Sequence, residues 1–209
     1  MAVEPRSDPK PQPERPMLLD RSAALLRIAA GVSGQQDLAR LFEDVIDESF
    51  SLFGVDQAGL WMYREGPQPL SLAAQRGLSP EILELVETLP GDATTAGMTA
   101  IREQRVQVMD GDLRYTLPDL REIYLRAGIR TICFVPIVFG GEPQGLLVLY
   151  HHHAYAWTQG EMDLARAFAD HMATAIGNAR LAKSTRTLAD RLRSISDLAI
   201  RLNLSLIHI

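Results

Sequence analysis

Hydrophobic and polar residues alternate over residues 57–63, which places Trp61 and Tyr63 on one side of an extended segment. A second extended run follows at 70–76, after a Glu-Gly-Pro turn at 65–67. Period-two alternation on both sides of a turn is typical of two paired strands. The pattern therefore predicts a first β-hairpin.

A second pair of runs, at 129–139 and 145–150, is apolar almost throughout rather than alternating. A Gly-Gly-Glu-Pro segment at 140–143 separates the runs and predicts a turn. Strands without polar positions are covered on both faces, so this hairpin is expected at the centre of a layered domain. Pro136 has no N–H to donate, which predicts a bulge or an edge position there.

Apolar residues at helical spacing predict helices before, between and after the hairpins. Two amphipathic helices come first, at 20–32 and from Asp37 to Gly54, with Asp37 as the cap and Gly54 as the stop. Three shorter helices are predicted at 80–88, from Thr94 or Thr95 to 103, and at 120–127, with a short strand at 106–109.

A long helix is predicted to close the domain. Thr158 and Glu161 have the spacing of a capping box, in which each side chain accepts a backbone N–H of the other residue. Apolar residues then follow at helical spacing, and beyond residue 180 they repeat every seven residues. This repeat predicts a coiled coil, with an ordinary surface helix as the alternative. The heptad positions used for this prediction are Leu181, Leu188, Leu192, Ile195 and Leu202.

Composition limits the classes of protein to which the chain can belong. The 209 residues are 46% hydrophobic and 22% charged, as expected for one globular domain with tails. The net charge of -5 argues against nucleic-acid binding, and no apolar run approaches the length that crosses a bilayer. Residues 1–17 contain five prolines and no apolar core, which predicts a disordered leader rather than a signal peptide. A cytoplasmic protein without a membrane partner is expected.

The second hairpin also carries a resemblance to a known family. A strand running into Val-Pro-Ile, a glycine-rich turn and then Gly-Leu-Leu-Val-Leu resembles the signature hairpin of GAF domains. The resemblance implies an α/β (α+β) fold, in which helices sandwich a central antiparallel sheet and a long C-terminal helix continues into a coiled coil. It places a small-molecule sensor domain at 18–182 and a signalling helix at 183–209. The last residues predict truncation at the start of a further domain.

As is typical of this family, such a module is expected to form a homodimer and to pass a signal to an output domain. A histidine kinase is the first expectation, and a diguanylate cyclase or a phosphodiesterase is the alternative. A purely structural dimerisation module without a ligand is the rival hypothesis. The chain itself is not expected to be an enzyme, because no catalytic constellation is recognisable.

In GAF domains the ligand lies between the sheet and an irregular helix-loop region, which maps here to residues 90–128. Threonines at a helix start are candidates to hold an anionic group, and tyrosines to stack on a ring. Strand residues are candidates for the floor of the cavity. Packing, capping or a surface position is the alternative for each residue. The candidates are Trp61, Thr94, Thr95, Asp110, Tyr115, Tyr124, Cys133 and Val135.

No cofactor or metal site is predicted. Cys133, the only cysteine, is followed by Phe134 in a strand, unlike the cysteine that carries the bilin in phytochrome-like GAF domains. One thiol also cannot serve the multi-cysteine chemistry of the related free-methionine-sulfoxide reductases. His171 is expected to be a helix histidine rather than a haem ligand. The three histidines at 151–153 are expected in a solvated loop, since adjacent side chains on an extended chain diverge.

Overall fold

The structure, a computed structural model, describes residues 38–111, 113, 117–178 and 181. Five strands of this part form one antiparallel sheet in the order β2-β1-β5-β4-β3. Both predicted hairpins are confirmed, and they join each other through β1 and β5. The strands are β1 (Gln57–Tyr63), β2 (Leu70–Arg76), β3 (Gln107–Asp110), β4 (Thr131–Phe139) and β5 (Glu142–His151).

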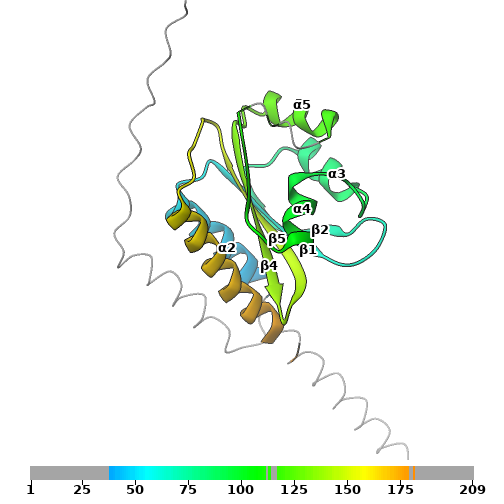
Figure 1. Cartoon of the computed structure of the whole chain (residues 1–209), viewed down its shortest axis with the longest axis vertical. Coiled ribbons are helices and arrows are strands. Elements are labelled where there is room, and N and C mark those ends of the chain that lie inside the picture. The colour runs from blue at the N-terminus through cyan, green and yellow to red at the C-terminus, as the bar shows by residue number, and fades with distance from the viewer. Residues whose placement is uncertain (1–37, 112, 114–116, 179–180, 182–209) are drawn as a thin grey trace, which may run out of the picture.

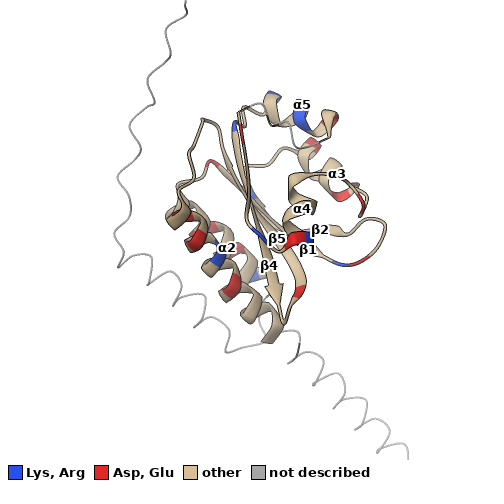
Figure 2. Cartoon of the chain, in the orientation of Figure 1, with Lys and Arg blue, Asp and Glu red and all other residues tan. Residues whose placement is uncertain are grey.

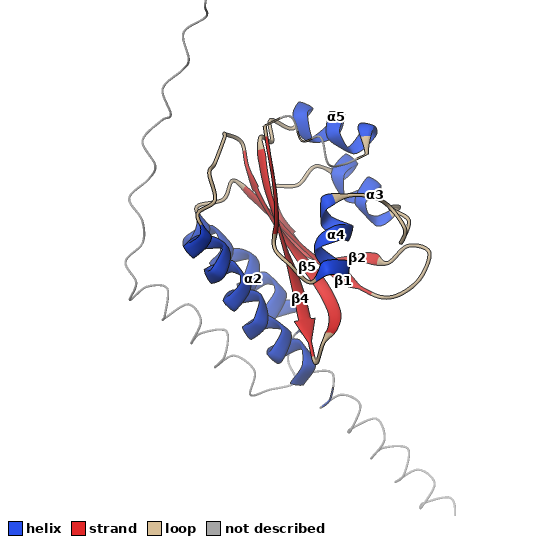
Figure 3. Ribbon diagram, viewed as in Figure 1, coloured by secondary structure: helices blue, strands red, loops and turns tan. Residues whose placement is uncertain are grey.

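Helices cover both faces of the sheet, as predicted (Figure 1). On one face lie α2 (Leu38–Phe53) and a closing helix that the structure describes over residues 159–178. On the other lie α3 (Pro80–Glu87), α4 (Ala96–Glu103) and α5 (Pro118–Arg126). Figure 3 shows the sheet nearly edge-on between these two helical layers.

Local capping explains where several helices begin and end. Ser79 accepts a hydrogen bond from the N–H of Ile82 at the start of α3. The capping box at the closing helix is formed, with the Thr158 N–H 2.9 Å from a carboxylate oxygen of Glu161. Gly54 ends α2 with φ of +60°, a conformation that glycine adopts without steric cost.

Strand alternation divides the buried side chains into two cores, one on each face of the sheet. The core under α2 and the closing helix includes Ile46, Leu60, Val135, Leu147 and Phe168. The core under α3, α4 and α5 includes Trp61, Met98, Tyr124, Phe134 and Val148. Charged residues lie mainly on the helices and in the loops (Figure 2). Among the described residues no Asp, Glu, Lys or Arg is buried, so the interior between the layers is largely apolar.

The register of the second hairpin contains a bulge. Phe139 pairs with Glu142 and Val138 with Pro143, but Ile137 then pairs with Gly145, so the register shifts by one residue and Gln144 is the extra residue in β5. Pro136 lies just beyond the stretch of β4 that pairs with β3, which ends at Phe134. The predicted edge position of this proline and a neighbouring bulge are therefore both present.

Several predicted segments lie outside the described residues. They are the leader at 1–17, the helix at 20–32, Tyr115, and the heptad residues Leu188, Leu192, Ile195 and Leu202. Leu181, the first heptad position, is 61% exposed on the surface. Among the described residues, no helix is both long enough and apolar enough to cross a membrane.

Candidate functional site

A cavity lies between the sheet and the layer of α3, α4 and α5. Its empty space is about 360 Å³, part of which opens to solvent. The walls approach so closely that only about one water molecule fits freely between them. Strands β1, β2, β4 and β5 supply the floor, and the helices and their loops supply the roof. The lining residues are Trp61, Leu70, Val86, Leu89, Thr95, Gly97, Met98, Leu120, Tyr124, Phe134, Leu146, Val148 and Tyr150.

Gly97 allows α4 to pack directly on the sheet. A Cβ atom at this position would lie 3.2 Å from Cδ2 of Leu146 and 3.2 Å from Cδ1 of Phe134, closer than nearly all real contacts of this kind. Thr95 caps the same helix, and its Oγ1 accepts the N–H of Met98 at 3.2 Å. The backbone geometry of α4 therefore sets the height of the cavity and places a threonine hydroxyl at its wall.

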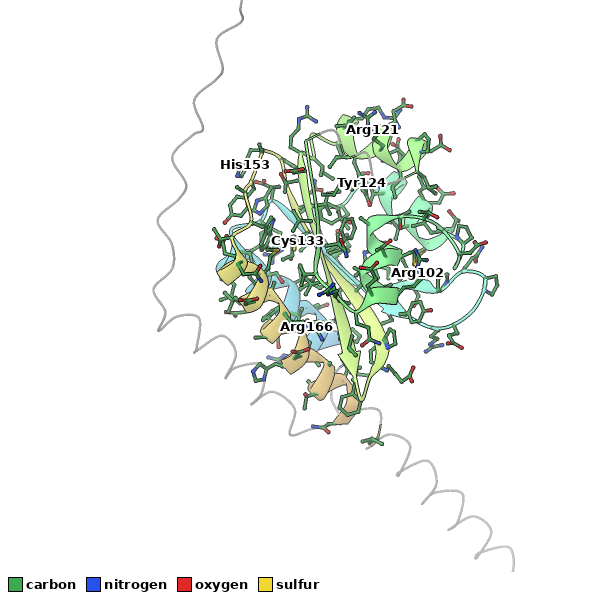
Figure 4. The ribbon with its side chains drawn as sticks, viewed as in Figure 1. Arg102, Arg121, Tyr124, Cys133, His153 and Arg166 are labelled. Carbon is green, nitrogen blue, oxygen red and sulfur yellow. The ribbon has the colours of Figure 1, made fainter. Side chains whose placement is uncertain are left out.

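Two tyrosines form the polar end of the cavity. The rings of Tyr124 and Tyr150 are 5.9 Å apart and tilted by 59°, and the two hydroxyls are close enough for each to influence the pKa of the other. Burial raises the pKa of both phenols well above the ordinary value, so both side chains stay neutral across the physiological range. Figure 4 shows Tyr124 reaching from α5 toward the sheet.

A third polar group belongs to Trp61. Its side chain is fully buried, and its indole Nε1 has no hydrogen-bond partner among the described residues. A buried donor without an acceptor destabilises the protein by about 1–3 kcal/mol, so an acceptor at this position would be favourable. Among the described residues, those that line the cavity include no charged side chain. The site therefore offers apolar surface and a few neutral hydrogen-bonding groups.

The structure brings together only some of the predicted site residues. Trp61, Thr95 and Tyr124 line the cavity. Thr94 and Asp110 are exposed and do not belong to its lining, and Tyr115 lies outside the described residues.

Cys133 and Val135 do not lie on the floor of the cavity, where the sequence analysis placed them. Both are fully buried in the core under α2 and the closing helix, on the face of the sheet opposite the cavity. The prediction that they line the ligand site beside Trp61 is wrong, because Phe134 between them faces the cavity instead. Burial also raises the pKa of the Cys133 thiol far above its ordinary value, which leaves it protonated and unreactive.

Most residues of the cavity floor are not among those predicted from the sequence. Leu146, Val148 and Tyr150 on β5, together with Phe134 on β4, lie on the same face as Trp61 because Trp61 pairs with Leu146. The sequence of β5 alone indicates that residues 146, 148 and 150 lie on the same side of the strand, because side chains alternate along a strand. The pairing of β1 with β5 is needed to show which side that is.

The histidines at 151–153 also differ from the prediction of a solvated loop. His151 is the last residue of β5 and its side chain is fully buried, whereas His152 and His153 are exposed. Burial, reinforced by His153, lowers the pKa of His151 from 6.5 to about 4. The His151 ring is therefore neutral at physiological pH.

Comparisons with known proteins agree on the fold. The family model described as GAF domain matches residues 37–176. A curated relative is the circadian input-output histidine kinase CikA of Synechococcus elongatus, which is 25% identical over 206 residues. The match covers 86% of this chain and 26% of the length of that kinase, so the chain spans about a quarter of its curated relative.

Solved structures with the same fold include sensor proteins. A domain of a two-component sensor histidine kinase protein from Sinorhizobium meliloti has a TM-score of 0.60 at 18% identity, covering 72% of this chain and 98% of that one. A phycocyanobilin-bound GAF domain of a cyanobacterial phytochrome has a TM-score of 0.63 at 18% identity, covering 78% of this chain and 96% of that one.

Proposed function

Since this chain belongs to the GAF domain family, we propose that it is a sensor module that binds a small uncharged molecule between its sheet and the layer of α3, α4 and α5. The observation that carries this proposal is the apolar cavity with a few buried, neutral hydrogen-bonding groups at its walls. Ligand sites in proteins typically combine apolar walls with a small number of placed polar groups.

The chemistry of the walls favours a neutral ligand with a ring. The described residues of the lining offer an anion no cationic partner in return for its lost water shell, and burying an unpaired anion is costly. The hydroxyls of Thr95, Tyr124 and Tyr150 and the indole N–H of Trp61 can instead serve an amide, a phenol or a ring nitrogen. We therefore propose an uncharged heteroaromatic or phenolic ligand, with the anionic group expected at Thr94 and Thr95 as the alternative.

Binding would require the roof of the cavity to move. The space between the walls accommodates about one water molecule, so a ring-sized ligand must favour a state in which α3 to α5 lie further from the sheet. Such a movement can be transmitted through the sheet to the other face of the domain. Phe134 on β4 faces the cavity, and its neighbours Cys133 and Val135 pack in the core under the closing helix.

The bilin of the similar phytochrome domain is not expected to attach covalently in this cavity. The single thiol of the chain, Cys133, lies on the opposite face of the sheet, is fully buried and keeps its proton. We therefore propose a ligand that is held without a covalent bond.

The output that we propose is a histidine kinase, reached through the helix that follows the domain. The histidine kinase named among the relatives supports this class, and the heptad pattern from Leu181 to Leu202 supports transmission through a parallel homodimer. A cyclase or phosphodiesterase output is the alternative. In either case the chain acts by binding and relay rather than by catalysis of its own.

A thermal-unfolding screen tests ligand binding. We would compare neutral ring compounds, such as p-cresol, indole, adenine and nicotinamide, with the anions cyclic AMP and benzoate. A ligand at a hundred times its Kd adds about 2.7 kcal/mol, which raises the melting temperature by about 5–11 °C for a domain of this size. Shifts confined to neutral compounds are expected.

The matched variants are Tyr124→Phe, which removes a hydroxyl from the cavity, and Tyr63→Phe, which removes one from a partly buried tyrosine outside its lining. Tyr124→Phe is expected to reduce the shift given by a hydrogen-bonding ligand, while Tyr63→Phe leaves it unchanged. If no compound shifts the unfolding of a dimeric protein, the rival function of dimerisation without a ligand is favoured.

A further inference from the structure

His151 has an unusual environment for a histidine. Its side chain is fully buried, and neither Nδ1 nor Nε2 has a hydrogen-bond partner among the described residues. The Tyr155 ring stacks on the imidazole, with centroids 4.2 Å apart and planes 11° from parallel. A buried imidazole normally donates one N–H and accepts at the other nitrogen, so two unused nitrogens indicate a partner that the described residues do not provide.

Two other ligand-type side chains converge on this ring. One atom each of Asp56, His151 and His153 lie within 4.8 Å of one another. Nδ1 of His153 is 3.7 Å from Oδ2 of Asp56, and the two histidine rings are 5.2 Å apart. Ligand atoms on a tetrahedral zinc ion are about 3.3 Å apart, given bonds of about 2.0–2.2 Å, so small side-chain rotations would close the group around one ion.

The backbone around these residues holds them in position. The Asp56 N–H donates to the carbonyl of Tyr150 at 2.9 Å, and the His152 N–H donates to Oδ2 of Asp56 at 2.7 Å. The Thr131 hydroxyl donates to the carbonyl of His153 at 3.1 Å. These bonds tie the segment before β1 to the segment after β5, which is the preorganisation that a metal site requires.

The ligand types select the class of ion. Two imidazoles and one carboxylate suit zinc and similar first-row divalent cations, whereas calcium and magnesium prefer sites made of oxygen alone. A neutral imidazole has one nitrogen with a free lone pair, and neither nitrogen of His151 is used in a hydrogen bond among the described residues, so one of them can bind an ion. Glu161, the next carboxylate near the ring, is engaged with the hydroxyls of Tyr155 and Thr158.

We propose that Asp56, His151 and His153 form a binding site for a zinc-type divalent cation, with the fourth position open to water. Asp56 follows the end of α2, and the two histidines precede the closing helix. Such an ion would fasten together the two segments that lead to the helices on that face of the sheet. Figure 4 places His153 at the edge of that layer, away from Tyr124, so this site is separate from the cavity.

Zinc titration by calorimetry tests the proposal on the whole chain, prepared without an affinity tag and treated with EDTA. One zinc ion per chain is expected, and cobalt is expected to give the strong visible absorption of a tetrahedral site. His153→Ala and Asp56→Asn, both at exposed positions, should each weaken zinc binding by at least about tenfold. Zinc should also raise the melting temperature of the unaltered chain but not that of Asp56→Asn.

The control is His152→Ala, which removes an exposed histidine of the same tract but keeps the backbone N–H that binds Asp56. It should bind zinc as the unaltered chain does. Two results would overturn the proposal: no saturable zinc binding, or a loss in His152→Ala equal to that in His153→Ala. The second result would mean that the histidine tract binds metal without a built site.

Discussion

At the scale of single residues, Gly145 allows β5 to lie close to the backbone of β1. A Cβ atom at this position would lie 2.5 Å from the carbonyl oxygen of Trp61, which is backbone and cannot turn away. We expect Gly145→Ala to lower the free energy of unfolding by about 2–3 kcal/mol, because the central pair of strands must separate. Urea unfolding would measure the loss.

Gly160 provides the matched substitution. It lies in the first turn of the closing helix, where a Cβ atom would meet nothing within 4 Å. Gly160→Ala is expected to raise the free energy of unfolding by about 0.5–1 kcal/mol, since alanine restricts the unfolded chain and favours the helix. Equal effects of the two substitutions would contradict the packing described for Gly145.

Cys133 gives a second prediction at this scale. Its thiol is fully buried and burial raises its pKa, so a thiol reagent such as DTNB should react only as fast as the domain unfolds. The unfolded thiol loses its proton above about pH 9 while the folded one retains it, so this group lowers stability as the pH rises through that range. Rapid labelling of the native protein would show that Cys133 is accessible after all.

At the scale of elements, α4 depends on its cap. Thr95 is buried and accepts the N–H of Met98 through its hydroxyl. Thr95→Ala should therefore lower the free energy of unfolding by about 1 kcal/mol, and Thr95→Ser should restore most of it. Thr99→Ala, within the same helix, should cost little, because alanine favours helix interiors more than threonine does. Chemical unfolding of the three variants would check this order.

The sequence was sufficient to predict the elements but not their register. Capping residues, turn glycines and hydrophobic periodicity are local signals, which is why the helix stop at Gly54 and the capping box at Thr158 could be predicted from the sequence. The face of the sheet on which each β4 residue lies depends on the bulge at Gln144 in β5. Without that extra residue, Cys133 would pair with Val148 and Val135 with Leu146, on the cavity side. One residue inserted into β5 moves every β4 residue before the bulge to the opposite face of the sheet. The hydrophobic periodicity of β4 is the same with or without the insertion, so it cannot reveal the change.

Other parts of the site depended on contacts between distant segments. Trp61 was found because it is the large aromatic residue of an alternating strand, and Tyr124 because it lies in the expected roof. The pairing of Tyr124 with Tyr150 and the convergence of Asp56 with His153 join residues far apart in the chain. Neither follows from local pattern, because both require the strand order.

At the scale of the whole molecule, the heptad pattern predicts association between chains. Leu188 and Ile195 lie outside the described residues, and their role rests on their spacing in the sequence. The unaltered chain should sediment as a dimer at tens of micromolar, and the double substitution Leu188→Asp with Ile195→Asp should give a monomer, because charges would enter the seam. Ser194→Asp, beside the seam, should remain a dimer.

The two helical layers, one on each face of the sheet, offer a route for the proposed relay. One layer closes the cavity, the other leads to the C-terminal segment, and β4 and β5 contribute side chains to both cores. A ligand acts on such a domain only through a difference in affinity between two arrangements of the layers. The proposed relay therefore depends on ligand binding in the cavity.

The fluorescence of Trp61 would test ligand binding in the cavity. The chain has two tryptophans, and Trp157 lies on the other face of the sheet, so Trp157→Phe leaves Trp61 as the single reporter in the cavity wall. Titration of this variant with each neutral compound that raises the melting temperature should change the emission saturably, with the same midpoint as the stabilisation. A compound that stabilises the protein while Trp61 emission stays constant would contradict binding in this cavity.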